Sequence, residues 1–179
     1  MMDDKEILDL CSKDQRKGFR LLMDLFQEPL YNHIRRLLVS HEDTQDALQE
    51  TFVRVFRGLN TFKGNSALST WLYRIATNES LRIIDKKKRE ADISSEDMQQ
   101  ELIGKLKTAE YIDYDDAMAV KFQEAILTLP EKQRLVFNFR YYDELEYDEI
   151  AKILDTKADT LKVNYHYAKE KVKNYILNH

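Results

Sequence analysis

Hydrophobic residues recur three and four positions apart along most of this chain, and this spacing is the period of an α-helix. The alternation typical of β-strands is nearly absent, and the 179 residues include only four glycines and two prolines. The pattern predicts an all-α protein. It also predicts two small helical domains, residues 1–90 and 118–179, because the periodicity weakens between them.

Three or four helices are predicted in the first domain. An early apolar stripe continues past Pro29, which we expect to bend or end a helical turn because proline removes a backbone donor. A clearer helix is predicted from Asp43 to Leu59, since large apolar residues occupy one side of it and polar residues occupy the other.

A polar loop at 62–65 precedes the last helix of the first domain. Gly64 gives this loop backbone freedom, and Ser66 or Ser69 can cap a helix that runs through Trp71 to Lys88. One interpretation of Trp71 is packing in the core. Alternatively, an aromatic side chain beside basic residues suits unpaired DNA, because bases stack on aromatic rings. The sequence leaves both interpretations open.

Acidic residues dominate the segment 91–117, where eight Asp and Glu residues accompany only two lysines. We interpret this segment as an acidic linker with at most a brief amphipathic turn or two. The second domain follows, and Pro130 is suited to the first turn of one of its helices.

The most informative pattern lies near the C-terminus. A short helix is predicted at 147–154, a tight polar turn at 155–157 and a second helix at 160–173. This order is typical of the helix-turn-helix, whose second helix enters the major groove of DNA. The same pattern also suits an amphipathic helix that closes a small bundle. In either case the apolar face of the second helix consists of Leu161, Tyr165, Ala168 and Val172.

Local charge favours DNA as the partner. The chain carries a formal net charge of −4, yet residues 160–173 contain four lysines and one glutamate. Residues 82–90 contain five basic and two acidic residues. Contact with phosphates requires such a local excess of positive charge.

Other features narrow the class of protein. No apolar run approaches the roughly 20 residues that span a membrane, and the N-terminus lacks a signal-peptide pattern, so we expect a cytoplasmic protein that does not insert into membranes. Cys11 is the only cysteine, which excludes an internal disulfide. The sequence contains no glycine-rich phosphate loop, paired-histidine metal motif or serine elbow. We therefore expect no catalysis, no cofactor and no bound metal.

Three groups of motifs resemble the bacterial RNA polymerase sigma factors of the sigma-70 type, specifically the small extracytoplasmic-function group. Residues 46–56, DALQETFVRVF, resemble the polymerase-binding helix of region two. Residues 62–78, FKGNSALSTWLYRIATN, resemble the segment that opens and reads the minus-ten promoter element. Residues 129–134, 149–154 and 160–173 resemble region four, which reads the minus-thirty-five element.

The resemblance implies a transcription initiation factor that binds core RNA polymerase, directs it to promoter DNA and assists promoter melting. An anti-sigma factor is a further implied partner. The residues implied to dock on the polymerase are Asp46, Gln49, Glu50 and Arg54. Those implied to contact the minus-ten element are Lys63, Asn65, Ser66, Trp71, Arg74, Asn78, Lys86, Lys87, Lys88 and Arg89. Those implied to contact the minus-thirty-five element are Thr160, Lys162, Val163, His166, Tyr167 and Lys169.

The chain departs from the family pattern at several positions. Asp155 and Asp159 stand where members often have glycine, and Arg82 stands where they often have an acid. Asn164 and Tyr167 stand where arginine is frequent. Because arginine makes bidentate contacts with guanine, we expect a less basic and more apolar reading surface than usual.

Two other functions remain open on the sequence alone. A two-domain helix-turn-helix regulator would bind DNA without polymerase. A magnesium-dependent nuclease or phosphohydrolase would use Asp113, Asp115 and Asp116, because neighbouring carboxylates can hold Mg²⁺. In an acidic linker, a solvated run of charge is the simpler interpretation of these three residues.

Overall fold

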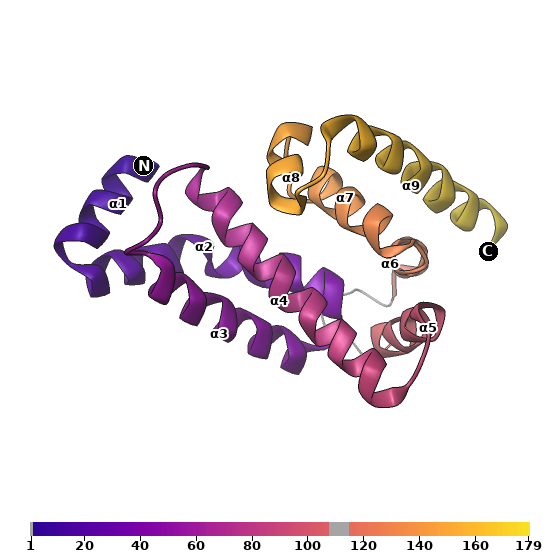
Figure 1. Cartoon of the computed structure of the whole chain (residues 1–179). Helices are drawn as coiled ribbons and strands as arrows, with labels where there is room; N and C mark the ends of the chain where they lie inside the picture. Colours follow the sequence, from indigo (N-terminus) through magenta and orange to yellow (C-terminus); the bar gives the residue numbers. More distant parts are fainter. Residues whose placement is uncertain (1, 108–114) are drawn as a thin grey trace. The chain divides into compact units, whose positions relative to one another are not determined.

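The computed structural model describes residues 2–107 and 115–179, and the described residues form α-helices without a strand (Figure 1). The prediction of an all-α protein is confirmed. The helices are α1 Asp4–Lys13, α2 Gln15–Leu38, α3 His41–Gly58, α4 Leu68–Ala91, α5 Ser95–Leu106, α6 Ala117–Leu127, α7 Glu131–Tyr141, α8 Tyr147–Leu154 and α9 Ala158–Asn178. They belong to two compact units, Met1–Ile83 and Ile84–His179, whose boundary falls within α4.

Side-chain caps fix the starts of the first three helices. Asp3 and Glu6 form a capping box at α1, since each side chain accepts from the backbone N–H of the other. Asp14 accepts from the N–H of Lys17 at α2, and Ser40 accepts from the N–H of Asp43 at α3. These polar residues therefore set where each helix begins.

Helix α2 continues through Pro29, which does not end it. Pro29 is exposed, whereas Leu30 and Ile34 directly after it are fully buried. Burial of the apolar face stabilises the helix on both sides of the proline, and this offsets the missing backbone hydrogen bond.

A tight corner joins α2 to α3. Val39 has φ 64° and ψ −48°, and the backbone N–H of Ser40 donates to the carbonyl of Leu38 at 2.6 Å. This is the geometry of a γ-turn, which is strained for a β-branched residue. The side chain of Val39 is 1% exposed, so packing of the corner holds this conformation.

Buried contacts to α2 and α1 fix the position of α4 within the first unit. His33 on α2 lies 2.9 Å from the hydroxyl of Thr77, and its ring meets that of Tyr73 edge to face at 5.4 Å. Burial, aided by the charge of Arg36, lowers the pKa of His33 to about 3. The backbone N–H of Leu68, at the start of α4, donates to the carboxylate of Asp4 at 2.9 Å.

Helix α5 lies in the segment that the sequence indicated as a linker. Met98, Leu102 and Leu106 are buried, which makes the helix longer and better packed than one or two turns. Gln99 donates through its side-chain amide to the carbonyl of Leu129 at 2.7 Å. The acidic residues of α5 lie on its solvent side, so their number hid a helix that packs in the second unit.

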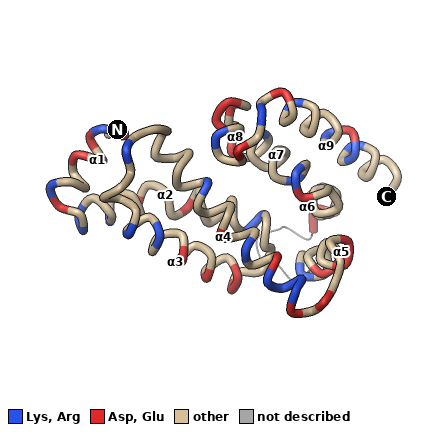
Figure 2. The backbone as a smooth tube through the Cα atoms, viewed as in Figure 1, with Lys and Arg blue, Asp and Glu red and all other residues tan. Residues whose placement is uncertain are grey.

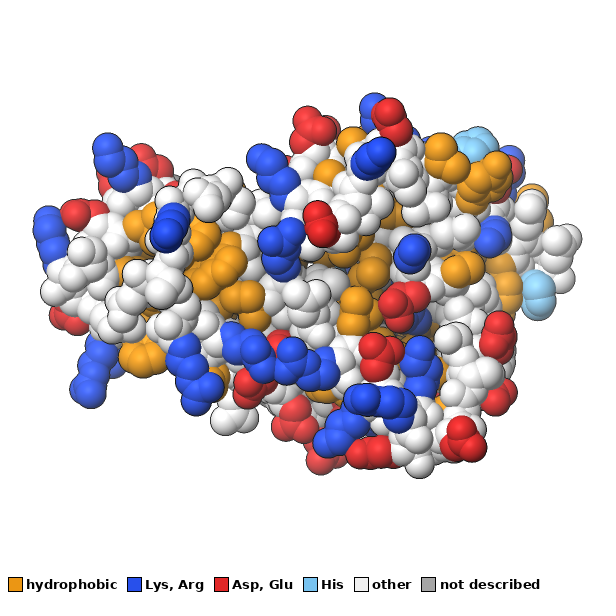
Figure 3. Space-filling model, viewed as in Figure 1, with side chains coloured by type: hydrophobic (Ala, Val, Ile, Leu, Met, Phe, Trp, Pro, Cys, Tyr) orange, Lys and Arg blue, Asp and Glu red, His pale blue; other side chains and the backbone are white. Residues whose placement is uncertain are grey.

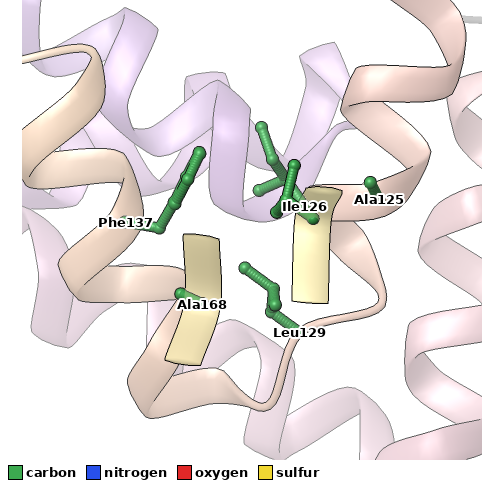
Figure 4. Packing of buried hydrophobic residues seen from close by; sticks show 6 residues of the cluster. Ala125, Ile126, Leu129, Phe137 and Ala168 are labelled. Carbon is green, nitrogen blue, oxygen red and sulfur yellow. The ribbon is translucent and has the colours of Figure 1, made fainter. Parts of the chain in front are cut away.

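The core of the second unit joins α6, α7 and α9 (Figure 4). The buried cluster consists of Ala125, Ile126, Leu129, Phe137, Ala168 and Val172. Phe122, Tyr165 and Tyr175 pack against it. The helix after Pro130 begins at Glu131, so this proline is the N-cap residue and lies one position before the first turn in which it was expected. Among the described residues, no helix is both long and apolar enough to cross a membrane.

Candidate nucleic-acid interfaces

The predicted helix-turn-helix is confirmed at α8 and α9. Helix α8 ends at Leu154, and Asp155 adopts the left-handed conformation with φ 51° and ψ 49°. The backbone N–H groups of Asp155 and Thr156 both donate to the carbonyl of Ala151, which terminates the helix. Asp155 therefore occupies a conformation that glycine adopts most easily.

Helix α9 has one buried face and one exposed face. Leu161, Ala168 and Val172 are buried as predicted, and Tyr165 is half-buried. The predicted reading residues are all exposed: Thr160, Lys162, Val163, His166, Tyr167 and Lys169. Figure 3 shows hydrophobic and histidine side chains on the surface over α9, and Figure 2 shows basic positions along the same helix. The geometry therefore brings the six residues together on one side of α9.

Arg140 on α7 positions both helices of the motif. Its guanidinium lies over the ring of Tyr147 at 4.6 Å and near the ring of Tyr165 at 5.8 Å. It also donates to the carbonyl of Leu145 at 2.8 Å. Because Tyr147 belongs to α8 and Tyr165 to α9, the guanidinium of Arg140 contacts both helices and fixes their relative position.

Two lysines of the reading face lie beside these aromatic rings. The ammonium of Lys169 is 4.9 Å from the ring centroid of Tyr165, and that of Lys162 is 5.9 Å from the ring centroid of Tyr147. Lys162 also lies 3.9 Å from the carboxylate of Asp159. Burial raises the pKa of Tyr165 despite the nearby Arg140 cation. Tyr165 therefore stays neutral, and the rings of Tyr147 and Tyr165 hold the two lysines beside the exposed face of α9.

Residues implied to contact the minus-ten element form a second exposed surface, along α4. Arg74, Asn78, Lys86 and Arg89 are exposed and recur at helical spacing on one face. Lys87 and Lys88 are half-buried instead. The ammonium of Lys88 lies 3.4 Å from both the carboxylate of Asp85 and the hydroxyl of Ser95, so this lysine links α4 to the start of α5.

The loop before α4 carries the remaining residues of this set. Gly64 has φ 72°, as its predicted freedom requires, and Lys63 and Asn65 are exposed beside it. Ser66 is half-buried. Trp71 is also half-buried and stacks on Phe62 at 4.7 Å, so its ring supports the loop and also reaches the surface. Packing against Phe62 is therefore observed for Trp71, and its contact with unpaired DNA stays a prediction.

A third surface lies on α3, where the resemblance implied contact with polymerase. Asp46, Gln49 and Arg54 are exposed, and Glu50 is half-buried. Arg54 is already engaged within the unit. Its Nε atom is 2.6 Å from the carboxylate of Glu79 on α4 and 3.3 Å from that of Glu50.

Glu79 is a carboxylate that the sequence did not single out. Its side chain is only 6% exposed and accepts from Arg54, with Arg82 at 3.5 Å. Glu79 lies one helical turn before Arg82 on α4. The spacing of Glu79 and Arg82 was visible in the sequence, but the pairing with α3 required the fold.

A groove between α2 and α3 was also missed. Its floor is apolar and its rim is polar, and its volume is about 730 Å³. The residues that line it are Phe19, Met23, Gln27, Gln45, Leu48, Gln49, Phe52, Val53, Phe56 and Arg57. Phe56 belongs to the apolar side predicted for the helix from Asp43 to Leu59, yet its side chain is 38% exposed. The apolar stripes of α2 and α3 are wider than the contact between these two helices. This excess width was the sequence signal that could have predicted the groove.

The acidic cluster of the linker is only partly within the described residues. Asp113 lies outside them. The carboxylate of Asp116 accepts from the backbone N–H groups of Met118 and Ala119 and so caps α6. The described part of the chain contains no group of three residues suited to holding a metal ion.

Family models match both units of the chain. The sigma-70 region 2 model matches residues 22–90, and the sigma-70 region 4 model matches residues 119–172. The first match covers α3 and α4, and the second covers the helix-turn-helix. The surfaces described above on α3, α4 and α9 therefore all lie inside the matched segments.

Curated relatives match nearly the whole chain. The ECF RNA polymerase sigma factor SigW of Bacillus subtilis is 30% identical over 183 residues, which cover 98% of this chain and 97% of SigW. The ECF RNA polymerase sigma-E factor of Escherichia coli is 30% identical over 182 residues, which cover 98% of this chain and 95% of that protein.

Solved structures share the fold at lower identity. CnrH in complex with the cytosolic domain of CnrY gives a TM-score of 0.70 at 16% identity, with 96% of this chain and 95% of that chain covered. RpoE in complex with the anti-sigma factor NepR, from Bartonella quintana, gives a TM-score of 0.69 at 20% identity, with 90% and 98% covered. Together with the family models and curated relatives, they confirm the resemblance: the chain belongs to the extracytoplasmic-function group of sigma-70 type RNA polymerase sigma factors.

Proposed function

We propose that this protein binds core RNA polymerase through α3 and directs it to promoters that contact α4 and α9. The exposed face of α9 carries this proposal, because six side chains suited to a DNA groove lie together on a helix-turn-helix. Core RNA polymerase is proposed as the partner because the chain belongs to the sigma family. The chain is a regulatory subunit without catalysis of its own, since the polymerase performs the chemistry.

The first domain, residues 1–90, binds the polymerase and captures the opened minus-ten strand. Exposed Arg74, Asn78, Lys86 and Arg89 support this role, because phosphates and unstacked bases need cations and polar groups along a track. Lys63 and Asn65 extend the track into the loop before α4. The second domain, residues 118–179, reads the minus-thirty-five element through α9. The segment 91–117 connects the two domains and contributes α5 to the packing around α6.

The direct test uses the purified protein with bacterial core polymerase on a random promoter library. We expect run-off transcripts only when both proteins are present, and the transcribed templates should share two short elements about two DNA turns apart. The same library should yield no specific complex with the protein alone.

An alternative outcome identifies a different function. Tight and specific binding of duplex DNA by the protein alone, unchanged by core polymerase, would show a conventional helix-turn-helix regulator. Failure of the protein to comigrate with core polymerase would contradict the proposal outright.

An anti-sigma factor is a further proposed partner. RpoE of Bartonella quintana, which shares this fold, was solved with the anti-sigma factor NepR. The apolar groove between α2 and α3 and the exposed face of α9 are surfaces that such an inhibitor would cover. Protection of these surfaces from hydrogen exchange by a candidate inhibitor tests this point.

A further inference from the structure

The exposed face of α9 combines apolar and weakly polar side chains with lysines. Helix α9 contains no arginine anywhere between Ala158 and Asn178. Its two most exposed hydrophobic residues before the C-terminal turn are Val163 and Tyr167, at 53% and 54% exposure. Neither side chain contributes to the buried core cluster. Their exposed side chains leave apolar surface on this face that a partner can cover.

Lys162 and Lys169 flank Val163 and Tyr167 on α9. Lys162 lies near Asp159 and the ring of Tyr147, and Lys169 lies near the ring of Tyr165. Lysine ammonium groups in such positions suit phosphates at the walls of the groove. The floor of the groove would then meet Val163 and Tyr167 together with His166, whose ring packs edge to face on Tyr167 at 5.6 Å.

Only one base presents an apolar group in the major groove, namely thymine with its C5-methyl. Bidentate recognition of guanine needs Arg or Lys. Helix α9 has no arginine, and Lys162 and Lys169 lie beside the rings of Tyr147 and Tyr165. Val163 and Tyr167 are one helical turn apart, or about 6 Å along the axis. Base steps are about 3.4 Å apart, so the two side chains span about two steps.

We propose that Val163 and Tyr167 read the C5-methyl groups of two thymines, about two base steps apart, in the minus-thirty-five element. This inference rests on the proposed function and adds the determinant of promoter sequence. The promoters of this protein are therefore rich in A·T pairs under the middle of α9. Lys162 and Lys169 contribute affinity but little sequence preference.

Replacement of thymine by deoxyuridine tests the methyl contact alone, because deoxyuridine lacks the C5-methyl group and keeps every hydrogen-bonding group of thymine. Templates come from the promoters that the holoenzyme selects from the random library. Each thymine of the minus-thirty-five element is replaced singly by deoxyuridine, and holoenzyme binding is measured. We expect a loss of about three- to fourfold at each of two positions, which is the value of one buried methyl-sized group.

Protein variants assign each position. Val163→Ala should weaken binding to the thymine template and abolish the effect of deoxyuridine at one position only. Tyr167→Ala should do the same at the other, whereas Tyr167→Phe should keep the methyl effect. Leu177→Ala is the matched control, because Leu177 is an exposed apolar residue on α9, at 72% exposure, near its C-terminal end. It should retain both effects of deoxyuridine.

The possible outcomes distinguish a failure of the methyl readout from a failure of the proposed initiation function. Core-dependent transcription with no deoxyuridine effect in the minus-thirty-five element overturns the methyl readout and leaves the initiation function intact. Selected elements that lack thymine have the same consequence. Failure of the protein to direct core polymerase to any promoter overturns both.

Discussion

Asp155 illustrates how a single backbone conformation shapes the reading unit. Its left-handed φ and ψ end α8 and send the chain into α9 within three residues. An L-residue with a Cβ is strained in this region, although Asp tolerates it better than most. The position of the recognition helix therefore rests on a residue that carries a conformational cost.

Replacement of Asp155 by glycine should stabilise the protein. We expect the free energy of unfolding to rise by up to about 1 kcal/mol, because glycine relieves the left-handed strain. Urea unfolding measures the change. Lys157→Gly is the control, because Lys157 has an ordinary extended conformation with φ −67°, and this variant should lose stability. Equal effects of the two variants would contradict the role of the left-handed turn.

His33 makes the stability of the first unit depend on pH. Its pKa is about 3 in the folded protein because of burial and the charge of Arg36, against about 6.5 in an unfolded chain. Below pH 6.5 the unfolded state binds a proton that the folded state refuses, so the free energy of unfolding falls as pH falls. Above pH 6.5 this contribution is constant.

The expected slope is roughly 1.4 kcal/mol per pH unit below pH 6.5. Urea unfolding at pH 7.0, 6.5, 6.0 and 5.5 measures it above the range in which most carboxylates titrate. His33→Gln should flatten the slope in this window even if it lowers stability overall. His179→Gln is the control at an exposed histidine and should keep the full slope. A steep slope that survives in His33→Gln would assign the effect to other groups.

At the scale of elements, the pair of Arg54 and Glu79 joins the surface proposed for polymerase to the helix proposed for DNA. Glu79 is buried on α4, and Arg54 is partly exposed on α3. An arginine held 2.6 Å from a buried carboxylate has its geometry fixed before any partner binds. Arg54 therefore positions α4 in addition to any contact with polymerase.

Removal of Arg54 should leave the buried Glu79 carboxylate short of a donor. We expect Arg54→Met to lower the free energy of unfolding by about 1–3 kcal/mol, the usual cost of a buried acceptor that loses its partner. Arg57→Met, at an exposed position one turn later on α3, is the matched control and should change it by less than about 0.5 kcal/mol.

The double variant Arg54→Met with Glu79→Leu tests whether the two residues act together. Its loss of stability should be clearly smaller than the sum of the two single losses, because no uncompensated buried charge remains. Additive losses would show that the ion pair does not couple α3 to α4.

At the scale of the whole molecule, the distribution of charge matters more than its sum. The net charge is −4, yet the two proposed DNA surfaces on α4 and α9 carry exposed cations (Figure 2). Acidic residues on α1, α3 and α5 account for much of the opposite charge. An overall acidic protein is a poor nonspecific DNA binder, so promoter binding in the complex with polymerase should depend on local cations.

The salt dependence of holoenzyme binding measures these cations. Lys86→Ser with Arg89→Ser should reduce the slope of log affinity against log salt by about 1.4–1.8, because each phosphate contact contributes about 0.7–0.9. Lys5→Ser with Lys17→Ser removes the same charge from α1 and α2 and should leave the slope nearly unchanged. A similar reduction in both variants would mean that total charge, and not the α4 surface, governs binding.

Local pattern alone determined much of this protein. The bounds of α8, the turn at 155–157 and the two faces of α9 followed from periodicity, because side chains three and four apart share a face in any helix. The left-handed Gly64 followed from the chemistry of glycine. These features depend on residues close together in the sequence, and this is why they could be predicted.

Only the tertiary structure decided the features that join distant residues. The γ-turn at Val39 exists because packing holds it, and no local propensity indicates it. Helix α5 forms because α6 packs against it and the residues directly after α6 offer carbonyl acceptors, although its own composition is acidic. The carboxylate of Glu79 meets Arg54 across 25 positions of sequence. The free energy that stabilises these features comes from burial and pairing between distant parts of the fold. The sequence alone does not reveal which distant groups will meet.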